Sequence, residues 1–205
     1  EKMRIAGQKA TSVLEMLRDH VIPGISTAKL DSLAFKFITE ELQCIPANIG
    51  YGGFPKTLCT SLNNVICHGI PSEDRILKNG DIVNIDVTVI DDGWHGDTSQ
   101  MFFVGKVAPH AKRLVNVTKD CLYAGIEQVK PGAKLGDIGF AIQQLAEVNH
   151  YSVVRDYCGH GIGKTYHEEP QVMHYGEQGQ GLELKEGMCF TIEPMINLGE
   201  YHSKV

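Results

Sequence analysis

A two-residue turn at Asp92-Gly93 is the feature that most constrains how this chain folds. Asp-Gly between two β-rich runs is a strong signal for a hairpin, and here the runs cover residues 82–90 and 94–104. Apolar and polar residues alternate in the first run, so we expect one face of the hairpin to lie in a core. The inward apolar residues are Ile85, Val87 and Val89.

The hairpin relates two carboxylates to each other. Counting outward from the turn places Thr88 opposite Asp97 and Asp86 opposite Ser99. Asp86 and Asp97 then share a face as diagonal neighbours, within reach of one ion. Two carboxylates so close repel each other, and a cation would relieve the repulsion. The alternative is a polar strand face exposed to water.

Two further candidate ligands follow later in the sequence. His160 stands among three glycines in CGHGIG, where little side-chain bulk screens the imidazole. Glu193 lies in FTIEPM, a strand-like apolar stretch in which a buried carboxylate needs a partner. A structural or exposed histidine is the alternative for the first, and a salt bridge is the alternative for the second. One nitrogen and several carboxylates suit Mn, Fe, Co or Zn.

Composition limits the class of protein. The 205 residues are 42% hydrophobic, enough for one large domain or two small ones. A net charge of −6 argues against binding to nucleic acid. No apolar run approaches the ~18 residues of a membrane span, and EKMRIAGQ lacks the apolar core of a secretory signal. We therefore expect a cytoplasmic protein that binds neither membranes nor nucleic acid, with its six dispersed cysteines reduced.

Helices and strands alternate in two blocks. The chain begins inside a helical pattern, so we expect further residues before Glu1, and Pro23-Gly24 ends this helix. Ser26 or Thr27 then caps a second helix. Further helices are predicted over 111–129 and 137–149, and further strands over 59–70, 151–158 and 187–195. Two helices followed by strands, twice over, predict an α+β protein with two similar halves.

Three long stretches carry most of the remaining information: NIDVTVIDDGWHGDTSQMF, CGHGIGKTYHEEPQV and GMCFTIEPM. They closely resemble the type I methionine aminopeptidases, metallopeptidases of the pita-bread fold, and the resemblance runs essentially end to end. Type II members carry a sizeable insertion between the His and Glu motifs. Only 33 positions separate His160 from Glu193 here, which favours type I.

The resemblance implies a fold and an activity. The fold is a single pita-bread domain over residues 1–205, with pseudo-symmetric halves of roughly 1–107 and 108–205 around a curved antiparallel sheet. The activity is removal of the initiator methionine from nascent chains whose second residue is small, so nascent N-termini are the expected partners. A monomer is expected. The ribosome stays open as a partner because no basic patch requires it.

The resemblance also implies a dinuclear metal site. Asp86 would chelate one divalent ion, Asp97 would bridge two, and His160 and Glu193 would complete the second ion's side, with Co, Mn, Fe and Zn as candidates. The ions would lower the pKa of a water nucleophile, and Glu193 would accept its proton and pass it to the leaving amine.

Substrate contacts follow from the same resemblance. His167 would hydrogen-bond the scissile peptide and the tetrahedral intermediate, and His68 would contact the amide nitrogen of the substrate and help stabilise that intermediate. The pocket for the methionine side chain would be lined by Tyr51, Phe54, Cys59 and Tyr166, for which packing in the core is the alternative. Asn63 and Val65 match a loop whose carbonyls hold Na⁺ or K⁺ in relatives.

The sequence departs from the family in one respect. The family supplies a fifth ligand, a bridging Glu, and a pocket Trp from a segment well beyond the position of Glu193, whereas this sequence stops at Val205. We therefore expect a chain truncated at its C-terminus, in which one metal binds more weakly.

Two other functions stay open. One is a pita-bread protein that binds peptides without catalysis, or an inactive fragment, although all four ligands persist. The other is an Xaa-Pro peptidase of the same superfamily, which usually carries an additional N-terminal domain; none is visible in this sequence.

Overall fold

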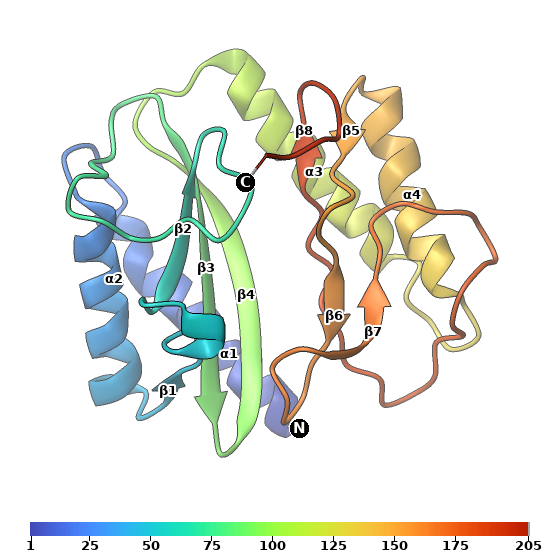
Figure 1. The fold of residues 1–205 in the computed structure, drawn as a ribbon, viewed down its shortest axis with the longest axis horizontal. Helices are drawn as coiled ribbons and strands as arrows, with labels where there is room; N and C mark the ends of the chain where they lie inside the picture. The colour runs from blue at the N-terminus through green and yellow to red at the C-terminus, as the bar shows by residue number, and fades with distance from the viewer. Residues whose placement is uncertain (205) are drawn as a thin grey trace. The chain divides into compact units, whose positions relative to one another are not determined.

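The computed structural model describes residues 1–204, and Figure 1 shows the ribbon. The chain forms two compact units. The first contains Glu1–Pro109 and Gly163–Thr165, and the second contains His110–Ile162 and the chain from Tyr166 onward. Each unit has its own cluster of buried apolar side chains. The assignment of one domain with halves meeting near residue 107 stays a prediction.

The first unit is built on the predicted hairpin. β3 (Ile82–Asp91) pairs antiparallel with β4 (Trp94–Phe103), and on its other side β3 pairs with β1 (Ile45–Pro46) and β2 (Leu58–Leu62). Asp92 and Gly93 have φ angles of +48° and +78°, which are the left-handed values that a type I′ turn requires. The predicted turn is therefore confirmed.

Two helices flank this sheet (Figure 1). α1 (Lys2–Leu17) packs against β3 and β4, and α2 (Thr27–Lys36) packs against β2. α2 is followed by a π-helical turn at Phe37–Glu41, η2. Ser26 caps α2 as predicted, because its Oγ accepts the Lys29 N–H at 3.1 Å.

α1 approaches β4 at backbone distance. A Cβ on Gly96 would lie 2.1 Å from the carbonyl oxygen of Ala6, so only glycine fits there. The same helix is tied to the end of the hairpin by two ion pairs, Lys9 with Asp91 at 2.6 Å and Lys2 with Asp92. α1 therefore covers the face of β4 that carries Gly96.

A buried carboxylate joins α2 to the start of β2. Asp31 Oδ1 accepts the main-chain N–H groups of Thr57 and Leu58 at 2.8 and 2.9 Å. Burial raises the pKa of Asp31 despite these two bonds. The aspartate thus fixes where β2 begins.

The predicted strand over 59–70 is too long. β2 ends at Leu62 because Asn63 takes a left-handed φ of +51° and its side chain bonds Asp81 and the Ile82 N–H. The chain then turns back, since the Gly69 carbonyl accepts the Thr60 N–H at 2.7 Å. A Cβ on Gly69 would lie 2.1 Å from the Thr60 carbonyl oxygen.

The second unit contains two helices and two short sheets. α3 (Pro109–Ile126) and α4 (Leu135–Val148) lie close to the predicted helices at 111–129 and 137–149. β5 (Ser152–Val153) pairs with β8 (Ile196–Asn197), and β6 (Gly159–Gly161) pairs with β7 (Glu168–Val172). α3 includes Pro109, the last residue assigned to the first unit. The first turn of α4 is closed by Asp137, which accepts the Lys134 N–H at 2.7 Å.

Two predicted strands of this unit are wrong in extent. Residues 151–158 contain only the two-residue β5, and 187–195 contain no strand, only an isolated bridge between Phe190 and Gly161. The main chain of Cys189 and Thr191 pairs with residues 160–162, but the Glu193 N–H donates to a histidine ring instead. The next residue, Pro194, has no N–H to give to a ladder.

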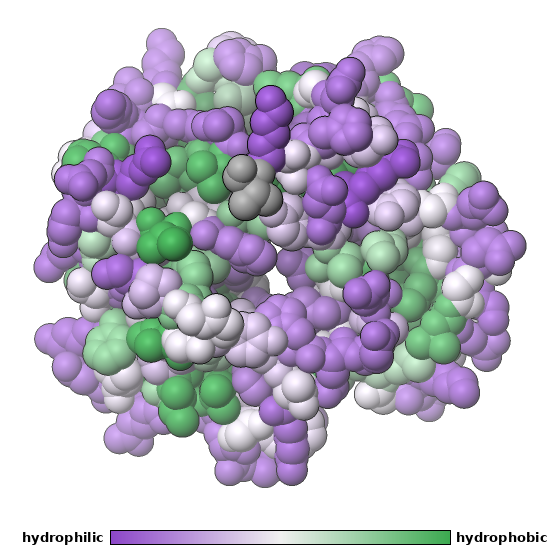
Figure 2. Space-filling model, viewed as in Figure 1, coloured by the Kyte–Doolittle hydropathy of each residue, from purple (hydrophilic) through white to green (hydrophobic). Residues whose placement is uncertain are grey.

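Two predictions about the environment can be compared with the structure. None of the six cysteines forms a disulfide, as expected, and burial raises the pKa of the Cys121 thiol to about 11. Among residues 1–204, no helix is long and apolar enough to cross a membrane. On the side drawn in Figure 2, hydrophilic residues predominate and hydrophobic ones form small separate patches.

Candidate metal centre

The two predicted carboxylate ligands of the first unit share one sheet face. β3 and β4 pair Thr88 with Asp97 and Asp86 with Ser99, as the hairpin predicted. Both aspartates are half-buried. They point away from α1, because the alternate face of β4 is the one that carries Gly96.

Cys59 lies on the same face and reports its electrostatic character. It stands opposite Asp86 on β2. Burial is the main cause that raises the pKa of its thiol, and the neighbouring Asp86, Cys67 and Asp97 raise it further. Burial disfavours a charge of either sign, so only the contributions of Asp86 and Asp97 favour a cation on this face. The cysteine is 7% exposed and is expected to stay a neutral thiol, which suits the apolar pocket predicted for it.

His68, the predicted substrate contact of this unit, has a strained backbone. Its φ is +56°, a left-handed value that is uncommon for residues other than glycine. Gly69 behind it is fixed against Thr60 of β2, so the surrounding chain maintains the strain. The imidazole itself is exposed. Such outliers concentrate at functional sites.

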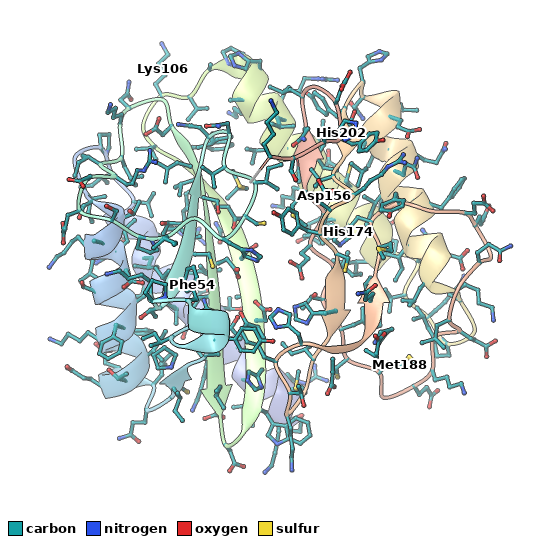
Figure 3. The ribbon with its side chains drawn as sticks, in the orientation of Figure 1. Phe54, Lys106, Asp156, His174, Met188 and His202 are labelled. Atoms are coloured by element: carbon teal, nitrogen blue, oxygen red, sulfur yellow. The ribbon has the colours of Figure 1, made fainter. Side chains whose placement is uncertain are left out.

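The remaining predicted pocket residues divide between the units. Tyr51 is 48% exposed at the 3₁₀ turn η3 (Tyr51–Gly53), and Phe54 follows it half-buried (Figure 3). Tyr166 belongs to the second unit and is 8% exposed. The loop with Asn63 and Val65 is held by the bonds of Asn63 to Asp81 and Ile82. Its role in binding Na⁺ or K⁺ stays a prediction.

In the second unit, β6 orients the ring of His160. Nδ1 lies 3.0 Å from the carbonyl oxygen of Gly161. Because a carbonyl can only accept, this nitrogen carries a proton, and in a neutral ring Nε2 would carry the lone pair. Nε2 lies 3.6 Å from Oε1 of Glu193.

This pair fits a divalent metal ion. Nε2 of His160 and Oε1 of Glu193 are 3.6 Å apart, which is too far for a hydrogen bond. Two ligands of a tetrahedral ion with bonds of about 2.0–2.2 Å are separated by about 3.3–3.6 Å. An imidazole and a carboxylate are ligands of Mn, Fe, Co and Zn. The tautomer and the spacing therefore suit ligation.

Glu193 is held by two residues that the sequence analysis did not identify. Thr191 Oγ1 donates to Oε1 at 2.6 Å, and the Glu193 N–H donates to His174 Nε2 at 3.0 Å. His174 is fully buried, which lowers its pKa to about 4 and keeps it neutral. For Thr191 a signal was present, because residues two apart in an extended stretch share a face. Nothing in the sequence pairs His174 with Glu193.

His167 and Tyr166 stack beside His160. The ring centroids of His160 and His167 are 4.1 Å apart, and those of Tyr166 and His167 are also 4.1 Å apart. His167 itself is exposed. The structure thus places His160, Glu193, Tyr166 and His167 in the second unit, as it places Asp86, Asp97, Cys59 and His68 in the first. Within residues 1–204 no group of three or more His, Cys, Asp or Glu side chains is arranged to hold a metal ion, so the set of four ligands stays a prediction.

Comparisons with known proteins identify the class. Residues 1–204 match the sequence model of metallopeptidase family M24, which defines a metal-dependent peptidase. A methionine aminopeptidase from Rickettsia prowazekii (strain Madrid E) is 60% identical over 200 residues, 98% of this chain and 76% of the relative. The methionine aminopeptidase of Escherichia coli (strain K12) is 54% identical over 200 residues, again 98% and 76%.

A solved structure agrees with the sequence comparison. The crystal structure of methionine aminopeptidase from Rickettsia prowazekii superposes with a TM-score of 0.96 at 59% identity, covering 98% of this chain and 80% of that one. The fold is therefore the α+β pita-bread fold, as predicted. The chain belongs to the methionine aminopeptidases of metallopeptidase family M24.

Proposed function

We propose that the protein removes the N-terminal methionine from nascent polypeptides in the cytoplasm when the second residue is small. The observation that carries the proposal is the pair of His160 Nε2 and Glu193 Oε1, oriented and spaced as ligands of one ion in a chain of the methionine aminopeptidase family. Nascent N-termini are the substrates, and the ribosome stays open as a partner. The enzyme acts as a monomer.

Four side chains would hold divalent ions of Mn, Fe, Co or Zn. Asp86 and Asp97 would supply oxygen ligands from one face of the hairpin. His160 and Glu193 supply a nitrogen and an oxygen from the second unit. Bound ions of this kind lower the pKa of water so that it can attack a peptide carbonyl at neutral pH.

Glu193 moves the proton. Its side chain is 41% exposed, so solvent and substrate can reach the carboxylate. A carboxylate at this position accepts the proton of the attacking water and returns it to the leaving amine. The Thr191 hydroxyl keeps Oε1 directed while the proton is transferred.

Two histidines act on the substrate. His167 donates to the scissile carbonyl, and its stacking on Tyr166 and tilted contact with His160 restrict the ring plane. His68 contacts the amide nitrogen from a loop whose strained backbone holds it outward. Tyr51, Phe54, Cys59 and Tyr166 line the methionine pocket, and the loop at Asn63 and Val65 binds Na⁺ or K⁺.

The test is release of methionine from a Met-Ala-Ser peptide by protein that has been stripped of metal and titrated with Mn²⁺, Fe²⁺ or Co²⁺. We expect release that depends on the metal, and no cleavage of an Ala-Pro peptide. Tight binding of Met-Ala-Ser without turnover would identify a peptide-binding protein instead. Cleavage of Ala-Pro in preference to Met-Ala would identify an Xaa-Pro peptidase.

A further inference from the structure

Glu193 is fixed at two points, the carboxylate and the main-chain nitrogen. The carboxylate accepts from Thr191 at 2.6 Å, and the N–H donates to His174 at 3.0 Å. We propose that Thr191 and His174 are positioning residues that set the direction of the Glu193 carboxylate. This inference rests on the proposed function, in which Glu193 binds metal and transfers a proton.

Thr191 links the two ligands of the second unit directly. Its N–H donates to the His160 carbonyl oxygen at 2.8 Å, and its Oγ1 accepts the His160 N–H at 3.0 Å. A threonine hydroxyl has one proton, and in this arrangement that proton points to Oε1 of Glu193. The position of the carboxylate oxygen is thereby defined relative to the main chain of His160.

The Thr191 bonds therefore set the distance between the two ligand atoms. Nε2 of His160 is fixed by the bond from Nδ1 to Gly161, and Oε1 of Glu193 is fixed by Thr191. Both side chains are anchored where the main chains of His160 and Thr191 are hydrogen-bonded to each other, so these bonds restrict the 3.6 Å separation of Nε2 and Oε1. Residues that hydrogen-bond to metal ligands act in this way.

His174 fixes the main chain of Glu193 to the core. It is fully buried (Figure 3), and its Nδ1 has no hydrogen-bond partner among residues 1–204. Leaving a buried polar atom unpaired costs free energy that an apolar side chain would avoid. What the imidazole adds is its Nε2 acceptor, and the group that uses this acceptor is the Glu193 N–H.

The segment that carries His174 is itself immobilised by α4. Gly139 of that helix lies against the carbonyl oxygens of Tyr175 and Met173, which a Cβ would approach to 2.4 and 2.9 Å. The position of the Glu193 main chain therefore depends on that of α4, because His174 contacts Glu193 and the segment around His174 packs on α4. A side chain at Gly139 would displace this contact.

The first test compares Thr191→Val, which keeps the shape and loses the hydroxyl, with Thr191→Ser, which keeps the hydroxyl. Thr118→Val is the matched control, because Thr118 also donates a hydroxyl bond in this unit, to Leu114 at 2.8 Å, away from Glu193. The kcat and KM for Met-Ala-Ser are measured, together with Mn²⁺ affinity by calorimetry on metal-stripped protein.

Thr191→Val is expected to lower kcat or Mn²⁺ affinity by about 10- to 100-fold, the range for groups that orient metal ligands, with KM little changed. Thr191→Ser should restore most of the loss, and Thr118→Val should match the wild type. Wild-type kcat and Mn²⁺ affinity in Thr191→Val would overturn the proposal for Thr191, as would an equal loss in Thr191→Ser.

The second test concerns His174. His174→Leu removes the acceptor and His174→Gln keeps an amide oxygen that can take the same N–H, so a larger loss of kcat is expected in the Leu variant. Circular dichroism establishes that each variant folds. If the Leu variant does not fold, the Gln variant decides: kcat near wild type supports the role, and kcat as low as in Glu193→Gln rejects it.

Glu193→Gln separates this inference from the function on which it rests. If that variant turns over substrate and binds Mn²⁺ like the wild type, the proposed role of Glu193 itself is wrong. If Glu193→Gln loses both while Thr191→Val and His174→Leu keep both, only the positioning roles are wrong.

Discussion

Two histidines of the second unit both carry a proton on Nδ1, and their Nε2 atoms face different groups. His160 and His174 both keep the proton on Nδ1, because Nδ1 of the first faces a carbonyl and Nε2 of the second faces an N–H. Nε2 of His160 faces Oε1 of Glu193 at 3.6 Å, whereas Nε2 of His174 accepts the Glu193 main-chain N–H. Similar residues thus take different roles through one hydrogen bond each.

We expect His68→Ala to lower kcat for Met-Ala-Ser by about 100-fold, the usual effect of removing one donor to a tetrahedral intermediate, with a smaller change in KM. Because His68 has a φ of +56°, the backbone needs its own control. His68→Asn supplies it, since asparagine tolerates left-handed values. A His68→Asn variant with wild-type turnover would show that the imidazole is not needed.

We expect Asp97→Asn to lower metal occupancy, because a neutral amide is a poorer ligand than a bridging carboxylate. The measurement is metal content by elemental analysis after dialysis against limiting Mn²⁺. Asp120→Asn in α3 is the control, as Asp120 is an exposed aspartate outside the predicted site. Full occupancy of both sites in Asp97→Asn would remove it from the ligand set.

At the scale of the element, the position of β2 depends on Asp31. Asp31→Ala would leave the buried N–H groups of Thr57 and Leu58 without an acceptor, so we expect a loss of about 2–4 kcal/mol in the free energy of unfolding. Asp31→Asn keeps an acceptor oxygen. Because burial raises the pKa of Asp31, a neutral side chain there should be tolerated at pH 7.

Urea unfolding at pH 7 measures both variants. The folded form of Asp31 binds its proton more tightly than the unfolded form does, so its contribution to stability falls as pH rises from the ordinary pKa of aspartate towards the raised one. Removing the charge should therefore not destabilise the protein. An Asn variant as unstable as the Ala variant would contradict this account.

The hairpin shows what could be read from sequence. Asp92-Gly93 specifies its turn locally, so the turn, the register and the shared face of Asp86 and Asp97 were all predictable. The stretch around Glu193 was not, because its polar groups bond to His160 and His174, which are distant in sequence. An apolar run such as CFTIE predicts a strand when those partners are unknown.

The prediction for the loop after β2 was wrong for a related reason. The left-handed Asn63 ends the strand, and Asn63 is held there by Asp81. The family resemblance named His68 as functional, but the backbone strain at that residue became visible only in the structure. Which residues belong to the candidate site was therefore easier to predict than their local geometry.

At the scale of the molecule, two cores supply one proposed ligand set. The first core includes Ile85 and Val87 of the hairpin that carries Asp86 and Asp97, and Ile192 beside Glu193 packs against the second. Each unit would contribute two of the proposed ligands. Metal affinity is expected to depend on the folding of both units.

We expect Mn²⁺ to raise the thermal midpoint, because a ligand that binds only the native state at 100 times its Kd stabilises it by about 2.7 kcal/mol. Differential scanning fluorimetry with and without chelator measures the shift. Ca²⁺ at the same concentration is the control, since it prefers oxygen ligands alone. Equal shifts with both ions, or an undiminished Mn²⁺ shift in Asp97→Asn, would contradict the proposed set.

The two-residue turn between β3 and β4 also sets the register of the two strands. Side chains alternate along a strand, so one extra residue at Asp92-Gly93 would move β4 by half a pleat repeat against β3. Asp97 would then face α1, and a bulkier side chain would replace Gly96 against Ala6. One inserted residue would leave all four predicted ligands in the sequence and still place Asp86 and Asp97 on opposite faces of the sheet. The length of this turn therefore matters to the proposed centre as much as the aspartates themselves do.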